Sequence, residues 1–145
     1  MIPDFYDGSF LPVGDHSAVW EEVVEKFGGT ATRKGFCDRL IKFLRQAKKC
    51  GFLKVYLFGS FISAKDDPGD VDLLWVHRQN LDKSALAQEC RDLLDYELMK
   101  AREDWDMWCC SNDPFVINYL MDGWRIDKGP KKTPRGVILL ELGSL

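Results

Sequence analysis

Two short stretches near the middle of the chain carry the residue types best suited to chemistry. The first is Val55-Tyr-Leu-Phe-Gly-Ser60, an apolar run that ends in a Gly-Ser pair, and the second is Asp70-Val-Asp72. Residues two apart on a strand share one face, so we expect both aspartate side chains to project together. Two carboxylates on one face repel each other unless a cation lies between them. The pair therefore predicts a site for Mg²⁺, which binds carboxylate and phosphate oxygens.

The Gly59-Ser60 pair suits a phosphate group beside that cation. A glycine at a strand end lets the backbone approach a ligand, and adjacent N–H groups can form an anion-binding nest. The Ser60 hydroxyl adds a donor toward a phosphate oxygen. By itself the pair is more typical of a plain tight turn. The aspartates change this balance, because two carboxylates at the mouth of a buried apolar strand need a partner.

The apolar periodicity predicts the elements that must position these residues. Spacings of three and four residues indicate helices, and nearly continuous apolar runs indicate central strands covered on both sides. The resulting order predicts an α/β or α+β fold, with helices packed against a small mixed sheet. We expect helices over 18–27, 32–49, 83–102 and 113–121, strands over 53–58, 71–76, 105–110 and 136–142, and a polar loop over 124–134.

Composition and charge bound the remaining possibilities. The 145 residues predict one domain over 1–145, with residues 1–15, rich in Pro and Gly, as an extended N-terminal arm. A net charge of -3 gives no support for a basic, groove-tracking nucleic-acid binder. No apolar stretch approaches the roughly 20 residues that span a bilayer, and the N-terminus has no signal organisation. We therefore expect a cytoplasmic protein without a membrane partner.

The five cysteines suggest neither a zinc site nor a disulfide framework. They form no Cys-x-x-Cys pair, and only two histidines accompany them. We expect all five to be reduced, packed thiols. The vicinal pair Cys109-Cys110 falls on an expected strand, where its two side chains should point to opposite faces.

At this point the chain resembles a known superfamily. Gly59-Ser60, then nine residues, then Asp70-Val-Asp72 resembles the Gly-Ser-x(n)-Asp-x-Asp signature of the DNA polymerase β-like nucleotidyltransferases. The apolar flanks of the signature are kept, and the size is similar to that of the minimal nucleotidyltransferases. A narrower similarity, to an uncharacterised bacterial and phage family of such domains, rests on Leu11-Pro-Val-Gly-Asp-His16, Trp20-Glu-Glu22, Gly59-Ser-Phe61, Pro68-Gly-Asp70 and Arg135-Gly-Val-Ile138.

The resemblance implies transfer of a nucleoside monophosphate, with AMP expected, from a nucleoside triphosphate to a hydroxyl on a protein or RNA acceptor. Asp70 and Asp72 would hold Mg²⁺, and Gly59-Ser60 would hold the triphosphate. A third carboxylate on a neighbouring strand is implied: Asp106 is preferred, and Asp104 stays open. Small members of the superfamily often belong to toxin–antitoxin or phage-defence modules, so a cognate toxin is one implied partner.

Several other side chains have both a functional and a structural interpretation. Lys65 is a phosphate contact or a solvated loop residue. Four basic residues late in the chain have three interpretations: they neutralise a triphosphate, bind a nucleic acid or form a charged loop. These residues are Lys128, Lys131, Lys132 and Arg135. Trp124 is the best candidate for stacking on a base, whereas Trp20, Trp75, Trp105 and Trp108 suit a core better. His16 caps the first helix, packs against the arm or, less in keeping with its context, takes part in catalysis.

Two rival functions remain open at this stage. The first is a non-catalytic binding protein that keeps the fold and acts as an antitoxin or inhibitor of a partner. The second is a nuclease that uses the same carboxylates. The nuclease is the weaker rival, because it leaves the Gly-Ser turn unexplained.

Overall fold

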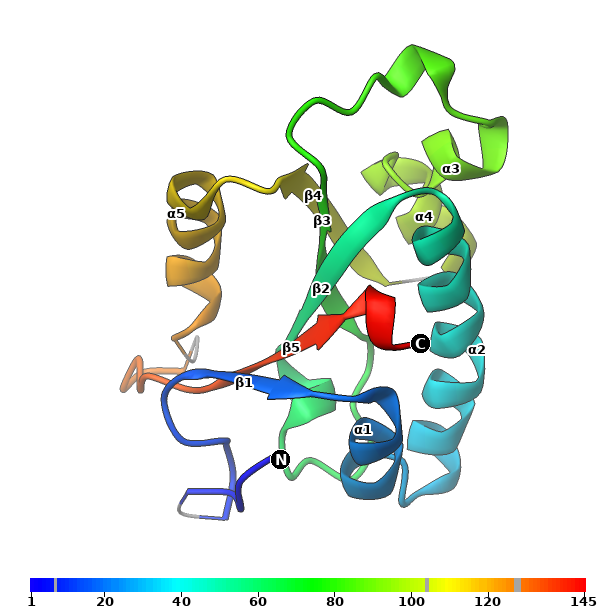
Figure 1. The fold of residues 1–145 in the computed structure, drawn as a ribbon. Helices are drawn as coiled ribbons and strands as arrows, with labels where there is room; N and C mark the ends of the chain where they lie inside the picture. Colours follow the sequence, from blue (N-terminus) through cyan, green and yellow to red (C-terminus); the bar gives the residue numbers. More distant parts are fainter. Residues whose placement is uncertain (7, 104, 127–128) are drawn as a thin grey trace.

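A five-stranded mixed sheet runs through the middle of the molecule, with helices on both of its faces (Figure 1). The computed structural model describes residues 1–6, 8–103, 105–126 and 129–145. β2 lies antiparallel to both β3 and β5, whereas β1 pairs with β5 and β3 with β4 in parallel. The expected small mixed α+β fold is thus confirmed. In sheet order the strands are β1 (Asp15–Ala18), β5 (Val137–Glu141), β2 (Phe52–Phe58), β3 (Asp72–His77) and β4 (Asp106–Ser111).

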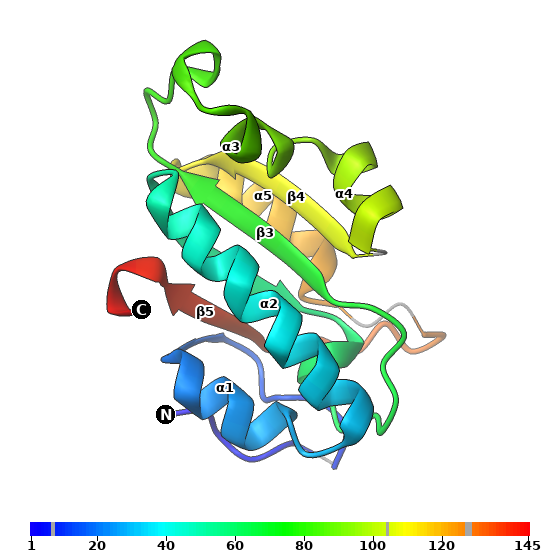
Figure 2. The ribbon, with the colours of Figure 1, turned by 90° about the vertical axis from the view of Figure 1, so that its right-hand side faces the viewer.

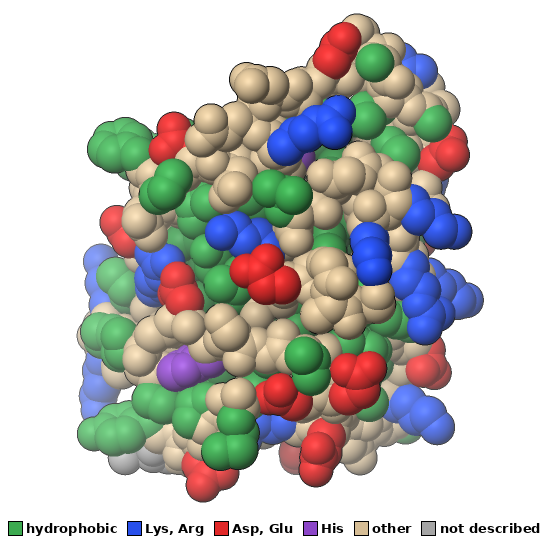
Figure 3. All heavy atoms as spheres, viewed as in Figure 1, with side chains coloured by type: hydrophobic (Ala, Val, Ile, Leu, Met, Phe, Trp, Pro, Cys, Tyr) green, Lys and Arg blue, Asp and Glu red, His purple; other side chains and the backbone are tan. Residues whose placement is uncertain are grey.

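Four helices cover one face of the sheet, here called the helical face (Figure 2). They are α1 (Trp20–Phe27), α2 (Ala31–Lys49), α3 (Gln88–Asp92) and α4 (Tyr96–Glu103). α2 begins where the Thr30 hydroxyl accepts a hydrogen bond from the N–H of Arg33, and its apolar stripe packs on alternate residues of the central strands. The outer side of α2 is lined with Lys and Arg, visible at the right of Figure 3. This basic surface therefore lies on the side of the sheet away from α5.

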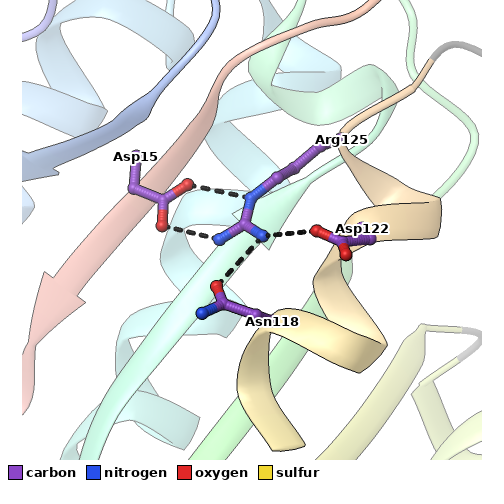
Figure 4. Close-up of polar contacts among 4 residues, drawn as sticks. All are labelled: Asp15, Asn118, Asp122 and Arg125. Atoms are coloured by element: carbon purple, nitrogen blue, oxygen red, sulfur yellow. Dashed lines mark hydrogen bonds and ion pairs between the residues drawn. The ribbon is translucent and has the colours of Figure 1, made fainter. Parts of the chain in front are cut away.

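One helix, α5 (Pro114–Trp124), packs on the opposite face, here called the open face. The Asp113 carboxylate accepts a hydrogen bond from the N–H of Phe115 and so caps its start. Arg125, directly after α5, donates two hydrogen bonds to Asp15, at 3.1 and 2.7 Å, and further ones to Asp122 and Asn118 (Figure 4). The far end of α5 is thereby tied to β1 at the edge of the sheet.

Two elements differ from the sequence prediction. The residues expected to cap the first helix form β1 instead, and α1 begins at Trp20. The expected long helix over 83–102 is broken into a 3₁₀ turn (Lys83–Ala85), α3 and α4. Leu86 and Ala87 take extended backbone conformations, which interrupts the helix although its apolar spacing continues.

The cysteine prediction is wrong for two of the five residues. Cys50, at the end of α2, forms a disulfide with Cys90 of α3. Cys37, Cys109 and Cys110 are free thiols. As expected, Cys109 and Cys110 point to opposite faces: Cys109 packs with the helical face and Cys110 with the open face. Among the residues that the structure describes, no helix is long and apolar enough to cross a membrane.

Candidate functional site

Three carboxylates meet on the open face where β3 and β4 begin. Asp72 is the first residue of β3 and lies opposite Asp106, the first residue of β4, in the parallel register; Asp70 comes two residues before β3. Each offers one carboxylate oxygen, and these oxygens all lie within 4.8 Å of one another. All three side chains are partly buried. Three oxygen ligands at this spacing suit a divalent cation, which would also offset their mutual repulsion.

Side chains from α4 hold Asp106 in its charged form. The Lys100 ammonium lies 3.1 Å from Oδ1 of Asp106, and the Tyr96 hydroxyl donates a 2.9 Å hydrogen bond to the same oxygen. Burial raises the pKa of Asp106, but the hydrogen bonds from Lys100 and Tyr96 and the positive charge of Lys100 outweigh it and leave that pKa below its ordinary value. The hydrogen bond to Asp106 in turn raises the pKa of Tyr96. Asp106 is therefore a carboxylate at neutral pH.

The Gly59-Ser60 turn lies directly against this cluster. Phe58, the last residue of β2, pairs with Asp72, and Gly59 then leaves the strand with φ of +80°. A Cβ at position 59 would lie 2.1 Å from Oδ2 of Asp72. Both the left-handed backbone and the lack of space require glycine here. The turn and the carboxylates thus form one surface.

Arg33 shapes the loop that follows the turn, and its role went unpredicted. Its side chain is 5% exposed. The guanidinium donates hydrogen bonds to Lys65 O at 3.1 Å and Ser63 O at 2.7 Å, and also to the carbonyls of Phe27, Ser60 and Phe61. One buried cation therefore satisfies a whole set of backbone acceptors. The sequence signal was an arginine inside the apolar stripe of α2.

A pocket of about 190 Å³ opens beside the carboxylates. Asp72, Asp106 and the Gly59-Ser60 turn form one part of its lining. Phe58, Trp108, Trp124 and Arg135 form the rest. Trp108, expected in the core, packs against the apolar cluster of the open face but is only half-buried and also lines the pocket; Trp75 and Trp105 are fully buried, as expected. Trp124 lies at the end of α5 rather than in a loop.

Three other predicted residues, Lys65, Arg135 and His16, lie outside the carboxylate cluster. Lys65 is exposed and is not part of the pocket lining, although its carbonyl binds Arg33. Arg135 is buried, and its Nε donates to the Trp124 carbonyl at 3.2 Å. Nε2 of His16, on β1, lies 2.6 Å from the Pro12 carbonyl, so His16 packs against the arm and does not cap a helix.

The remaining basic and acidic candidates fall into two groups. Lys131 and Lys132 are exposed and lie outside the pocket lining. Asp104 and Lys128 lie outside the residues that the structure describes. The carboxylate cluster as described is therefore completed by Asp106.

Together, the fold and the site define a small mixed α+β protein with an acidic cluster and an aromatic pocket at one end of its sheet. The chain belongs to the family described as a family of unknown function (DUF6932), whose model matches residues 3–141. No curated protein and no solved structure matches the chain. The family match thus covers nearly the whole chain and does not indicate an activity.

Proposed function

We propose that the protein is a Mg²⁺-dependent nucleotidyltransferase that moves a nucleoside monophosphate, with AMP expected, from a nucleoside triphosphate to a hydroxyl on a protein or RNA acceptor. One observation carries the proposal. Carboxylates from two neighbouring strands converge against a glycine turn that leaves no room for a side chain. The spacing of Gly59-Ser60 and Asp70-Val-Asp72, which resembles the polymerase β-like signature, supports the same activity.

In this proposal the two parts of the site bind different parts of the nucleotide. Asp70, Asp72 and Asp106 hold Mg²⁺, and the Gly59-Ser60 backbone with the Ser60 hydroxyl donates to the triphosphate. Bound Mg²⁺ would polarise the phosphate oxygens and stabilise the leaving pyrophosphate. Arg33 supports the phosphate end indirectly, because it fixes the carbonyls of the loop after Ser60.

The transfer step needs no reactant other than the nucleoside triphosphate and the acceptor hydroxyl. The acceptor oxygen attacks the α-phosphorus, a new phosphoester bond forms, and the bond between the α- and β-phosphates breaks to release pyrophosphate. Asp106 accepts the hydroxyl proton. It then releases this proton to solvent.

The test is transfer of label from α-³²P nucleotides to components of a cell lysate. Wild type should label an acceptor in the presence of Mg²⁺. The Asp70→Asn, Asp72→Asn double variant should fold and label nothing. Asp67→Asn, an exposed aspartate in the same loop, serves as the matched control and should keep full activity. Labelling by the double variant at the wild-type level would contradict the proposal.

A second function, a non-catalytic antitoxin or inhibitor on the same fold, is favoured by one contact. The Lys100 ammonium already offsets charge on Asp106 without a metal. Thermal unfolding with millimolar ATP and Mg²⁺ separates the two, because a ligand that binds only the folded state raises the unfolding temperature. A clear rise supports the enzyme, and no rise with any nucleoside triphosphate supports the binding protein. In either case, a toxin–antitoxin or phage-defence setting is proposed by analogy with small superfamily members.

A further inference from the structure

Four aromatic rings from four different elements form a cluster at the candidate site, in which Phe58 contacts Trp108 at 6.0 Å as well as Trp124. Tyr96 of α4 lies 5.4 Å from Trp108 of β4, measured between ring centroids. Trp108 lies 4.7 Å from Trp124 of α5, which stacks on Phe58 of β2 at 4.4 Å and an interplanar angle of 15°. Three of these rings line the pocket that also contains Asp72 and Asp106. This aromatic cluster thus lies directly beside the acidic cluster.

The surroundings of Trp108 and Trp124 differ from those of the structural tryptophans. Trp75 and Trp105 are completely buried among apolar side chains. Trp108 and Trp124 are only half-buried, and they share a pocket with two carboxylates and a serine. A flat ring with a polar edge is the kind of group that can contact indole rings at one end of such a pocket and remain hydrated elsewhere. A nucleobase has this shape and chemistry.

We propose that Trp108 and Trp124 form a base-binding subsite that selects the nucleotide by stacking area, so that purines bind better than pyrimidines. This inference rests on the proposed nucleotidyltransferase function and adds the basis of its nucleotide selection. Stacking on aromatic side chains tolerates every base, because each base has a π-face, and the larger purine ring covers more of the indole surface.

The polar part of the lining offers little to distinguish one purine from another. The carboxylates and Ser60 lie at the end assigned to metal and phosphate. Arg135 is the basic side chain of the described lining, and its Nε already donates to the Trp124 carbonyl. We therefore expect ATP and GTP to bind about equally, because discrimination between purines needs hydrogen bonds to the base edge.

Calorimetric titration of the whole chain with ATP, GTP, CTP, UTP and inorganic tripolyphosphate, each with Mg²⁺, tests the subsite. Both purine nucleotides should bind more tightly than the pyrimidine nucleotides, and all four more tightly than tripolyphosphate. Trp124→Leu should weaken ATP binding about 5- to 150-fold, the range expected for losing one stacked base. Binding of tripolyphosphate should not change, and Trp124→Phe should recover part of the ATP affinity. Trp20→Phe, on α1, is the matched control and should bind like wild type.

Three results would overturn the inference, and they separate it from the proposed function. If wild type binds tripolyphosphate and all nucleotides equally, the base subsite is wrong and the phosphate and metal site stands. If Trp124→Leu loses ATP and tripolyphosphate to the same degree, the tryptophan is only structural. If wild type binds none of the five ligands, the proposed nucleotidyltransferase function fails together with the subsite.

Discussion

The two faces of the sheet differ in what covers them and in what their side chains do. On the helical face, four helices bury a continuous apolar core against alternate residues of the central strands. On the open face, α5 covers one part of the sheet, and the carboxylates and aromatic pocket occupy the end where β3 and β4 begin. The strands thus present apolar side chains to both faces, and the open face carries carboxylates where β3 and β4 begin.

The candidate function is therefore confined to one end of the open face, while apolar packing covers the rest of the sheet on both sides. In β3, Leu73 and Trp75 point into the helical core, whereas Asp72 points to the acidic cluster. A like-charged cluster opposes folding unless a cation or a donor compensates it. The buried apolar residues on both faces of the sheet supply the stability that permits it. Variants on each face test this division.

The first prediction concerns the disulfide that anchors α3 to the end of α2 on the helical face. Removing the Cys50–Cys90 bond with a reductant should lower the free energy of unfolding by about 4 kcal/mol, because the bond closes a loop of 40 residues in the unfolded chain. Urea unfolding with and without reductant measures the loss. The Cys50→Ala, Cys90→Ala variant is the control and should not respond to reductant. An equal response of both proteins would contradict the assignment.

The second prediction compares one leucine from each face. Leu44 of α2 is completely buried in the helical core, whereas Leu120 of α5 is only partly buried. Leu44→Ala should cost about 3 kcal/mol of the free energy of unfolding, and Leu120→Ala about 1 kcal/mol. Urea unfolding of both variants measures the difference. Equal losses would show that the open face contributes as much to stability as the helical face.

The third prediction concerns the turn on the open face. Gly59→Ala should cost about 2 kcal/mol, because it forces a Cβ onto Asp72 and a side chain onto a left-handed backbone. The variant should also lose Mg²⁺–tripolyphosphate binding in calorimetry. Gly29→Ala, where a Cβ meets no atom within 4 Å, is the matched control and should change stability by less than about 0.5 kcal/mol. Normal ligand binding by Gly59→Ala would contradict a phosphate role for the turn.

The sequence predicted the acidic cluster on the open face better than the disulfide on the helical face. Strand alternation was enough to place Asp70 and Asp72 on one face, and the parallel pairing of β4 brings Asp106 beside them. The Cys50–Cys90 pairing could not be read from the sequence, because it joins residues 40 positions apart that only the packing of α3 brings together.

Other contacts were missed for a similar physical reason. Arg33 donates hydrogen bonds to carbonyls about 30 residues away, and no local sequence pattern indicates such a contact. β1 is four residues long and has a largely polar sequence, which is typical of a helix cap. Its parallel pairing with β5 is what makes it a strand. Trp108 has core spacing, and its place in the pocket lining depends on Phe58, Trp124 and the carboxylates that the fold brings beside it.

The last and smallest effect is a pH dependence at the acidic cluster. Lys100 helps to hold the pKa of Asp106 below its unfolded value, so this contact stabilises the fold above about pH 4 and is lost as the pH falls through the lower folded pKa. Lys100→Met should therefore cost less than about 1 kcal/mol at pH 7, since the pair is partly exposed. The cost should shrink as the pH falls below 4 and Asp106 takes up a proton in both proteins.

Urea unfolding between pH 2 and pH 7 measures this dependence. Lys34→Met, on the outer side of α2, is the matched control and should leave the pH dependence below pH 4 unchanged. A constant difference between Lys100→Met and wild type across this range would show that Lys100 acts by packing rather than by charge. A difference that grows with pH would instead show that the open face depends on a cation at Asp106, supplied by Lys100 in the absence of a metal.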